Sequence, residues 1–369
     1  MSKKIVSLCL ALSCCLPLAW GEESVNNEPP IMPKDLVCSI TTGENNPRNS
    51  EGGFVKLKNG DIFYVYTHFT GNDSNDHAPS YLAARRSSDN GTTWTDADEI
   101  ALDNEGKGNT MSVSLLRLAN DEIAMFYLVR EHPGDCRPYM RISKDECQTW
   151  GDRILCFPDE SYSGVNNDRV IQLGNGKLIM PIGRHKFLGP DEYNFEWTAD
   201  VFCMISDDNG RTWAMGDLVD NPDKVMYQEP GVVELADGRL LMNIRTGSGS
   251  QYFAWSEDEG QHWTTPVPSC LDSPVSPAVI KRIPGRDELL AVWNPLLPDR
   301  SRTAMDIGIL SPDGQTLKVR KRLEPIDSDK NFQYPAVLFL NDSEFLVSYF
   351  NWKVSNYIYK LNIIDLLDE

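Results

Sequence analysis

The octapeptide SDDNGRTW, Ser206 to Trp213, decides the fold of this chain because close copies of it recur along the sequence. The other copies are SSDNGTTW from Ser87, SKDECQTW from Ser143 and SEDEGQHW from Ser256. Their final tryptophans are spaced by 56, 63 and 50 residues. Repeats of this length are typical of architectures that reuse one supersecondary unit, so the pattern describes a fold before it describes a site.

An apolar hairpin precedes each octapeptide, and two further hairpins follow the last copy. The six runs are FVKLKNGDIFYVYT, VSLLRLANDEIAMFYLVR, VIQLGNGKLIMPIGR, VVELADGRLLMNIR, AVIKRIPGRDELLAVWN and AVLFLNDSEFLVSYFN. Three of them turn through Asn-Gly or Asp-Gly, the strongest short-range hairpin signal. Six β-rich units at this spacing predict an all-β, six-bladed β-propeller.

The octapeptides are expected to be the turns between the two outer strands of each blade. In such a turn Asp accepts backbone hydrogen bonds, Gly supplies a positive φ, and Trp packs between neighbouring sheets. A decayed copy, SPDGQTL from Ser311, marks blade five, and blade six has none. We expect the stretch from Asp35 to Thr41 to supply the outer strand of blade six and so close the ring.

The N-terminus predicts export of the protein. Lys3 and Lys4 precede an apolar run that ends in AWG, which indicates a signal peptide over residues 1–21 and a secreted, periplasmic or cell-surface location. Lipidation at Cys14 or Cys15 is an alternative fate of this segment. The mature chain has no other stretch apolar enough to span a membrane.

The remaining chain is expected to be a short polar leader, residues 22–32, followed by one propeller domain, residues 33–369. Removing Lys3 and Lys4 moves the formal charge from −19 to about −21. This acidity argues against nucleic acid as a partner, and an anionic ligand would need a local cationic pocket.

Six cysteines remain after removal of the signal peptide. Cys136, Cys147 and Cys156 are close enough in sequence to form a local disulfide, which an oxidising compartment would permit. The cysteines and histidines show no zinc-binding spacing, so we expect neither a metal site nor a cofactor.

Chemistry is expected on the face opposite the octapeptide turns, where the inner strands begin and the second strands end. This assignment of strands to blades brings six reactive side chains to this face: Arg48, Asp76, Glu229, Arg245, Arg302 and Tyr334. Possible further substrate contacts there are His77, Asp168, Arg169, Arg184 and His185. Three arginines on one face of so acidic a protein point to an anionic ligand, with carboxylate as the leading candidate.

The octapeptides and the order of these residues resemble those of the sialidase (neuraminidase) superfamily, whose Ser-x-Asp-x-Gly-x-x-Trp repeats are called Asp boxes. The loop NDHAPSYLAARRS resembles the segment that carries the acid/base aspartate, here Asp76. QEPGVVELADGRLLMNIRT resembles the segment with the assisting glutamate and the second arginine, here Glu229 and Arg245. SRTAMDIGIL and FQYPAVLFLND match the regions of the third arginine, Arg302, and the nucleophilic tyrosine, Tyr334.

The resemblance implies a secreted exo-α-sialidase-like glycoside hydrolase acting on sialylated or other acidic glycans. Arg48, Arg245 and Arg302 would clamp the sugar carboxylate. A neutral phenol can approach that group where a carboxylate nucleophile would be repelled, so Tyr334 would attack with retention, and Glu229 would act as its base.

The match departs from the family pattern at three places. Arg48 stands in NPRNSEG, where Glu51 could pair with it; Tyr334 and Glu229 are each followed by proline. In the acid/base loop Asp73 competes with Asp76. Two other functions therefore stay open: a propeller polysaccharide lyase acting on uronate-containing glycans, with His185 and Arg184, and a non-catalytic carbohydrate-binding propeller.

Overall fold

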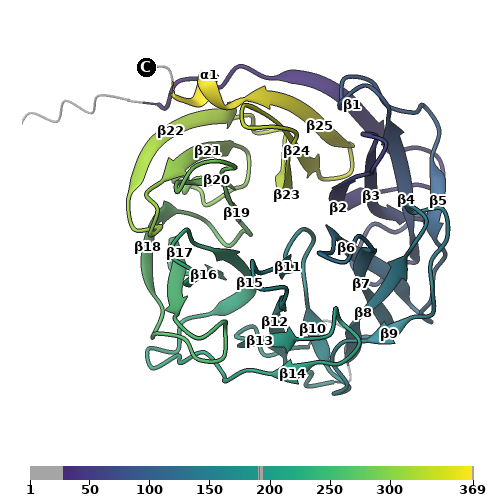
Figure 1. The fold of residues 1–369 in the computed structure, drawn as a ribbon, viewed down its shortest axis with the longest axis horizontal. Coiled ribbons are helices and arrows are strands. Elements are labelled where there is room, and N and C mark those ends of the chain that lie inside the picture. Colours follow the sequence, from purple (N-terminus) through teal and green to yellow (C-terminus); the bar gives the residue numbers. More distant parts are fainter. Residues whose placement is uncertain (1–27, 190, 192–193, 368–369) are drawn as a thin grey trace, which may run out of the picture.

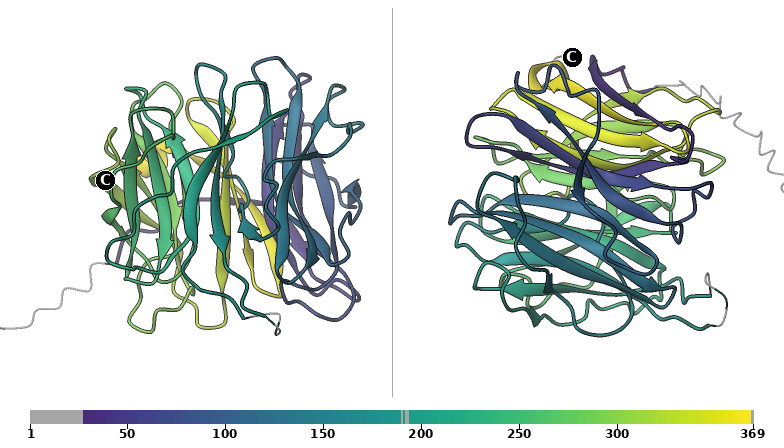
Figure 2. Two further views of the ribbon diagram at one scale, coloured as in Figure 1. Left: turned by 90° about the horizontal axis from the view of Figure 1, so that it is seen from below. Right: turned by 90° about the vertical axis from the view of Figure 1, so that its right-hand side faces the viewer.

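The computed structural model describes residues 28–189, 191 and 194–367. The predicted signal peptide lies outside these residues. Five sheets form a ring, and the largest of them contains two blades, so that the molecule is a six-bladed β-propeller (Figure 1). The strands run along the short axis of the ring, with loops at both ends (Figure 2).

Each blade is built from consecutive strands, counted outward from the axis. Blade one holds β2 (Asn49–Lys56), β3 (Ile62–Phe69), β4 (Ser80–Ser87) and β5 (Glu99–Leu102). Blade two holds β6 (Asn109–Arg117), β7 (Ile123–His132), β8 (Asp135–Ser143) and β9 (Ile154–Leu155). Blade three holds β10 (Tyr162–Gly164), β11 (Ile171–Gln172), β12 (Leu178–His185), β13 (Asp200–Ser206) and β14 (Ala214–Met215).

The second half of the ring follows the same plan. Blade four holds β15 (Tyr227–Glu234), β16 (Leu240–Thr246), β17 (Ser250–Ser256) and β18 (Val267–Asp272). Blade five holds β19 (Val279–Arg282), β20 (Leu289–Trp293), β21 (Met305–Leu310) and β22 (Leu317–Glu324). Blade six holds β23 (Phe332–Phe339), β24 (Glu344–Asn351) and β25 (Ser355–Asn362), and the short helix α1 (Ile363–Leu367) follows it.

The ring closes as predicted, through the N-terminal strand β1 (Asp35–Thr41). It pairs antiparallel with β25, from Asp35 opposite Lys360 to Thr41 opposite Ser355. In Figure 1 β1 therefore lies beside β25. The chain packs on the propeller even before β1, because Met32 is buried and donates a backbone hydrogen bond to Arg322. The folded part thus begins inside the stretch expected to be a leader.

The hydrophobic core is divided into six clusters, one in each gap between neighbouring blades. The tryptophans of the Asp boxes extend this division. Trp94, Trp150, Trp213 and Trp263 each pack against the cluster shared with the preceding blade. Burial of apolar surface between blades is what holds a propeller together, so the boxes stabilise the ring directly.

The Asp boxes are turns of the predicted kind. In the third box Gly210 has φ +83°, its amide donates to Ser206 Oγ at 2.9 Å, and the Thr212 amide donates to Asp208 Oδ1 at 2.8 Å. In the second box Cys147 takes the glycine position at φ +64°.

The local disulfide that the sequence allows is not formed. All six cysteines of the described chain are free thiols. Cys147 points into the core between blades one and two, whereas Cys136 and Cys156 lie in the core between blades two and three. Cys147 is thus separated by a sheet from Cys136 and Cys156, and the second Asp box adopts its turn without a cross-link.

Candidate functional site

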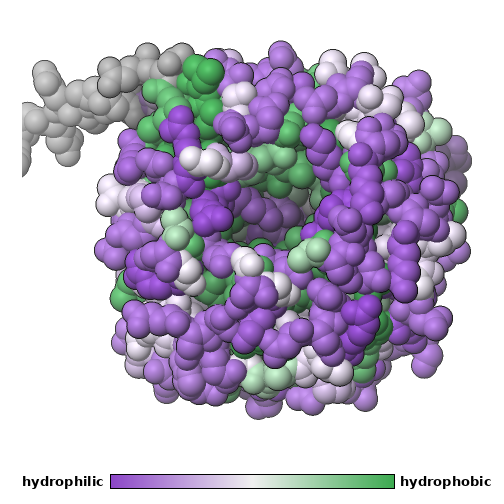
Figure 3. All heavy atoms as spheres, viewed as in Figure 1, coloured by the Kyte–Doolittle hydropathy of each residue, from purple (hydrophilic) through white to green (hydrophobic). Residues whose placement is uncertain are grey.

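A pocket of about 180 Å³ opens at the end of the ring opposite the Asp boxes. The face drawn in Figure 3 shows a hollow at the centre of the ring. The chemically notable side chains that line the pocket are Glu51, Asp76, His77, Ser112, His185, Trp197, Glu229, Arg245 and Tyr334. They come from blades one, two, three, four and six, so the site exists only in the closed ring.

Local backbone geometry turns four of these side chains toward the axis. Glu51, Ser112, Glu229 and Tyr334 have φ values of +51°, +51°, +31° and +53°. Each lies where the register of the innermost strand shifts against its neighbour. Such β-bulges re-aim a side chain, and non-glycine residues held at positive φ concentrate at functional sites. Glu229 and Tyr334 thus lie within β15 and β23, and not before these strands as predicted.

Tyr334 and Glu229 form the central pair of the pocket. The Tyr334 hydroxyl donates to Glu229 Oε1 at 2.7 Å, and the other carboxylate oxygen of Glu229 accepts from Arg245. Arg245 Nη1 also lies 3.5 Å from the Tyr334 hydroxyl. The ring of Tyr334 stacks on Phe350 with an interplanar angle of 4°, which fixes its direction.

The pKa values of this pair are shifted in opposite directions. Burial and the charge of Glu229 raise the pKa of Tyr334 well above its ordinary value. For Glu229, burial acts in the same sense, but the charge and hydrogen bond of Arg245 and the hydrogen bond from Tyr334 lower its pKa overall. Tyr334 is therefore a neutral phenol beside an ionised carboxylate, the arrangement in which an adjacent base can activate a nucleophile.

Asp76 lies at the pocket rim on the β3–β4 loop, and its partner is Arg48. Arg48 Nη1 lies 2.5 Å from Asp76 Oδ1. Desolvation would raise the pKa of Asp76, but the charge and hydrogen bond of Arg48 lower it below its ordinary value. The Asp76 side chain is still 49% exposed, so it can meet a ligand in the pocket.

The three arginines predicted as a carboxylate clamp are placed unequally, and only Arg245 lines the pocket. Arg48 is 1% exposed and packed beside the rings of Phe69, Phe350 and Trp352. Arg302 donates to the Val275 carbonyl and, at 2.8 Å, to Gln333 Oε1. Burial and the charge of Arg245 lower the pKa of Arg302 to about 10.

Of the further predicted substrate contacts, two line the pocket and three do not. His77 and His185 line the pocket, and burial lowers the pKa of His185. Asp168 instead pairs with Lys281 at 2.7 Å and accepts from the Val337 amide, which places it in the interior.

Arg169 and Arg184, like Asp168, do not line the pocket. Arg169 is 2% exposed and Arg184 lines a separate cavity, where it pairs with Asp200 at 2.8 Å. The inner strand of blade three is split into β10 and β11, and the intervening segment carries Arg169 away from the pocket surface.

Buried positive charge exceeds negative charge around the pocket. Besides the clamp arginines, Arg130 acts electrostatically on Asp76, and Arg169 is influenced by Asp168, Glu229 and Tyr334. Nε and Nη1 of Arg130, and Nε and Nη2 of Arg169, have no hydrogen-bond partner among the described residues. Five guanidinium groups thus face four carboxyl groups, those of Glu51, Asp76, Asp168 and Glu229, and Asp168 is already paired with Lys281. Unpaired buried cations favour an anionic ligand.

Glu51 and Ser112 are among the pocket residues that sequence reasoning missed, as is Trp197. A signal for Glu51 and Ser112 exists in the hairpin turns. Leu57, Leu118, Leu235 and Leu340 each donate a backbone hydrogen bond that closes the first hairpin of a blade. The residue six positions earlier is Glu51, Ser112, Glu229 and Tyr334, respectively. In these four blades, counting back from the turn leucine finds the axial position, whereas Leu173 of blade three leads to Asn167, which does not line the pocket.

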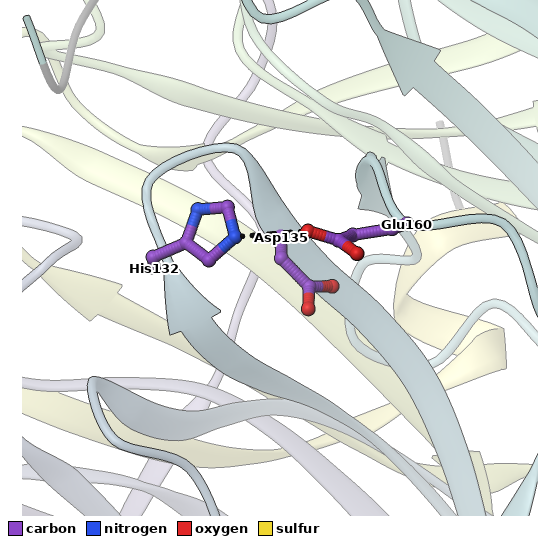
Figure 4. A group of neighbouring side chains, drawn as sticks. All are labelled: His132, Asp135 and Glu160. Atoms are coloured by element: carbon purple, nitrogen blue, oxygen red, sulfur yellow. Dashed lines mark hydrogen bonds and ion pairs between the residues drawn. The ribbon is translucent and has the colours of Figure 1, made fainter. Parts of the chain in front are cut away.

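Three side chains that could together bind a metal ion lie outside the pocket, at the β7–β8 connection of blade two and just before β10 of blade three. His132 Nε2 and Glu160 Oε1 are 3.1 Å apart, with Asp135 beside them (Figure 4). The Asp135 carboxylate already accepts from Arg137 at 2.6 and 2.9 Å. Asp135 is thus held in an ion pair with Arg137, and His132 and Glu160 lie within hydrogen-bond distance of each other.

Comparison with known proteins agrees with the fold. A family model described as a BNR repeat-like domain matches residues 84–347. A sialidase of Micromonospora viridifaciens is 27% identical over 281 residues, which cover 67% of this chain and 42% of the relative. A sialidase of Clostridium perfringens is 27% identical over 57% of this chain and 59% of its own. The chain thus spans about half the length of these curated relatives.

Solved structures with the same fold include a microbial sialidase, Hadza Hz136, with a TM-score of 0.71 at 18% identity, covering 87% of this chain and 67% of the other. An intramolecular trans-sialidase of Ruminococcus gnavus superimposes with a TM-score of 0.70 at 15% identity, covering 88% and 96%. Among the described residues no helix is long and apolar enough to cross a bilayer.

Proposed function

Because this chain belongs to the BNR repeat-like family of the sialidase superfamily, we propose that it is a retaining glycoside hydrolase that releases a terminal sialic acid or a related acidic sugar. The observation that carries this proposal is the 2.7 Å hydrogen bond from Tyr334 to Glu229 beside Arg245, at the floor of a pocket with excess positive charge. A binding protein would have no need of a buried phenol–carboxylate pair.

The reaction would proceed in two steps. As the Tyr334 oxygen attacks the anomeric carbon, Glu229 takes the phenolic proton, and Asp76 gives a proton to the departing glycosidic oxygen. The C–O bond to the leaving group breaks and a glycosyl–tyrosine bond forms. Water then attacks the same carbon, Asp76 takes its proton, and the proton on Glu229 returns to Tyr334. Two displacements at one carbon give net retention.

Arg245 contributes to this reaction in two ways. Its contact with Glu229 keeps that carboxylate ionised and therefore able to accept a proton. Its 3.5 Å approach to the Tyr334 hydroxyl stabilises negative charge as it develops on the phenolic oxygen. The substrate carboxylate, held close to the same guanidinium, would place the anomeric carbon over Tyr334.

The test is hydrolysis of 4-methylumbelliferyl α-N-acetylneuraminide by wild type, Tyr334→Phe and the control Tyr252→Phe. Tyr252 is a partly buried tyrosine of blade four that packs against the core shared with blade three, outside the pocket. We expect kcat to fall at least about a hundredfold in Tyr334→Phe and to be unchanged in Tyr252→Phe. Nuclear magnetic resonance of the first-formed sugar should show retention.

Two results would contradict the proposal. Full activity of Tyr334→Phe removes the nucleophile from the mechanism. A wild type that is inert on aryl and natural sialosides, but produces an unsaturated uronate from an acidic polysaccharide, would make the protein a lyase. The structure gives that alternative less support, since Arg184 pairs with Asp200 and the His185 Nδ1 atom is 3.0 Å from the Glu196 carbonyl.

A further inference from the structure

Glu51 is a third carboxyl group in the pocket, and the mechanism above does not use it. It is 3% exposed and lines the same cavity as Asp76, Glu229 and Tyr334. Its Oε2 lies 3.8 Å from Nη2 of Arg48, whose other terminal nitrogen is engaged by Asp76. A carboxyl group placed at the floor of a pocket for an anion needs an explanation, because its ionised form would repel the ligand.

The position of Glu51 in the fold is that of the reacting residues. It occupies in blade one the axial bulge that Glu229 occupies in blade four and Tyr334 in blade six. The left-handed backbone at this bulge, φ +51°, holds a non-glycine residue in a strained conformation. Such a strained backbone at a bulge indicates that the side chain is needed in the position to which the bulge directs it.

The surroundings of Glu51 favour its neutral form. The titratable and charged groups that face it are Arg48 before β2, Asp76 on the β3–β4 loop, Cys136 of β8, Glu229 of β15 and Tyr334 of β23. Burial is the main effect, and with the charges of Asp76 and Glu229 it outweighs Arg48 and the hydrogen bond of Ser112 and raises the pKa of Glu51 to about 7.

We propose that Glu51 is a specificity-determining residue, whose protonated carboxyl donates a hydrogen bond to the carboxylate of the acidic sugar held by Arg245. This inference rests on the proposed function, since it assumes an anionic sugar in the pocket. A neutral carboxyl next to an arginine offers one donor to a carboxylate and adds no repulsion. The ionised form would instead exclude the same ligand.

The sign of the pH dependence follows from this pairing. The complex holds the proton on Glu51 more tightly than the free protein does, so full affinity is present below about pH 7, the pKa of free Glu51. Above it, affinity falls by about tenfold per pH unit, until the pKa of the complex is reached. Binding in that range takes up a proton from solution.

Calorimetric titration tests the inference with two acidic sugars as probes, N-acetylneuraminate and D-glucuronate. Wild type, Glu51→Gln and the control Glu105→Gln are compared at pH 5.5, 7.5 and 8.5. Glu105 is a largely buried carboxylate bound to Tyr127 and Arg141 outside the pocket. At pH 7.5, two buffers of different ionisation enthalpy measure proton uptake.

For wild type and Glu105→Gln we expect binding of at least one acid, uptake of at least about half a proton at pH 7.5, and a Kd that rises about tenfold from pH 7.5 to 8.5. For Glu51→Gln, a neutral isostere, we expect no proton uptake and a Kd that changes less than about twofold.

Three results would overturn the inference: binding by wild type without proton uptake, an undiminished pH dependence in Glu51→Gln, or no binding of either acid at pH 5.5. Since wild type supplies the first and third results, poor folding of a variant cannot hide them. Failure of the proposed function would be recognised separately, as binding of an acid with proton uptake but without hydrolysis of any sialoside.

Discussion

Asp76 illustrates how one ion pair constrains the role of a residue. Its carboxylate is bound by Arg48 at 2.5 Å, which lowers its pKa in the free protein. An acid must carry a proton when the leaving group departs, so in the proposed reaction the pairing with Arg48 has to weaken. A substrate anion that draws on the same arginine would have this effect, since it reduces the charge acting on Asp76.

A leaving-group comparison tests the role of Asp76. We expect Asp76→Ala to lose about 10²–10⁴-fold in kcat on sialyllactose, whose departing alkoxide needs a proton. The loss should be about tenfold or less on the aryl sialoside, because a phenolate departs unaided. The steady-state rates of both substrates give the measurement.

Asp73 provides the matched control for this experiment. It lies on the same loop, where its carboxylate accepts a hydrogen bond from the Asn75 backbone amide at 3.0 Å. It does not line the pocket. Asp73→Ala should keep the ratio of the two rates. If the leaving-group split appears in Asp73→Ala and not in Asp76→Ala, the acid/base has been placed on the wrong aspartate.

At the scale of the elements, the Asp box is a turn whose stability depends on one carboxylate. Asp208 accepts from the Thr212 amide at 2.8 Å, the Thr212 hydroxyl at 2.7 Å and the Ser206 hydroxyl at 2.9 Å. The neighbouring Asp207 is 74% exposed and makes one ion pair, with Lys177 at 3.4 Å. Two adjacent aspartates of one box therefore differ sharply in structural role.

We expect Asp208→Ala to lower the free energy of unfolding by about 2 kcal/mol, and Asp207→Ala to change it by less than about 0.5 kcal/mol. Urea denaturation measures both. Desolvation opposes the shift, but the Thr212 hydrogen bonds lower the pKa of Asp208, so its contribution is present above the ordinary carboxyl pKa and is lost as pH falls below it.

Activity separates this structural role from a functional one. With both variants folded at 25 °C, kcat/KM on the aryl sialoside should equal that of wild type, because the boxes lie at the opposite end of the ring from the pocket. A selective loss of activity in Asp208→Ala, with stability retained, would instead make the Asp box part of the site.

What the sequence predicts at this scale is what local chemistry determines. Hairpins and Asp boxes follow from turn residues and alternating apolar positions, and these predictions are confirmed. The split of the inner strand of blade three into β10 and β11 has no such local signal. Neither does the capture of Arg48 by Phe69, Phe350 and Trp352, because these rings come from two blades that are far apart in the sequence.

The candidate site shows the same division between local and tertiary causes. The assignment of strands to blades was enough to place Asp76, Glu229, Arg245 and Tyr334 at one end of the ring. It could not show that a bulge turns Glu51 inward. The spacing from the turn leucine marks the bulge position in four blades, but whether the side chain there lines a pocket depends on packing between blades.

At the scale of the whole molecule, the site depends on closure of the ring. Blade six supplies Tyr334, and β1 supplies the outer strand of that blade from the other end of the chain. Ile40 of β1 is buried in the core shared by blades six and one. Without β1, the strand β25 would be an unpaired edge and this core would be open on one side.

A truncated protein that begins at residue 42 tests this dependence. Loss of the β1 ladder and of the burial of Ile40 should lower the free energy of unfolding by about 5 kcal/mol, measured against a protein beginning at residue 28. We expect the hydrolytic activity on the aryl sialoside to fall in parallel, because Tyr334 lies in the blade that loses its outer strand. A synthetic peptide of residues 28–44 should restore both properties in trans, whereas a scrambled peptide of the same composition should restore neither. If the truncated protein unfolds at the same urea concentration as the longer one, the ring is held closed by the remaining blade contacts, and β1 only covers an edge.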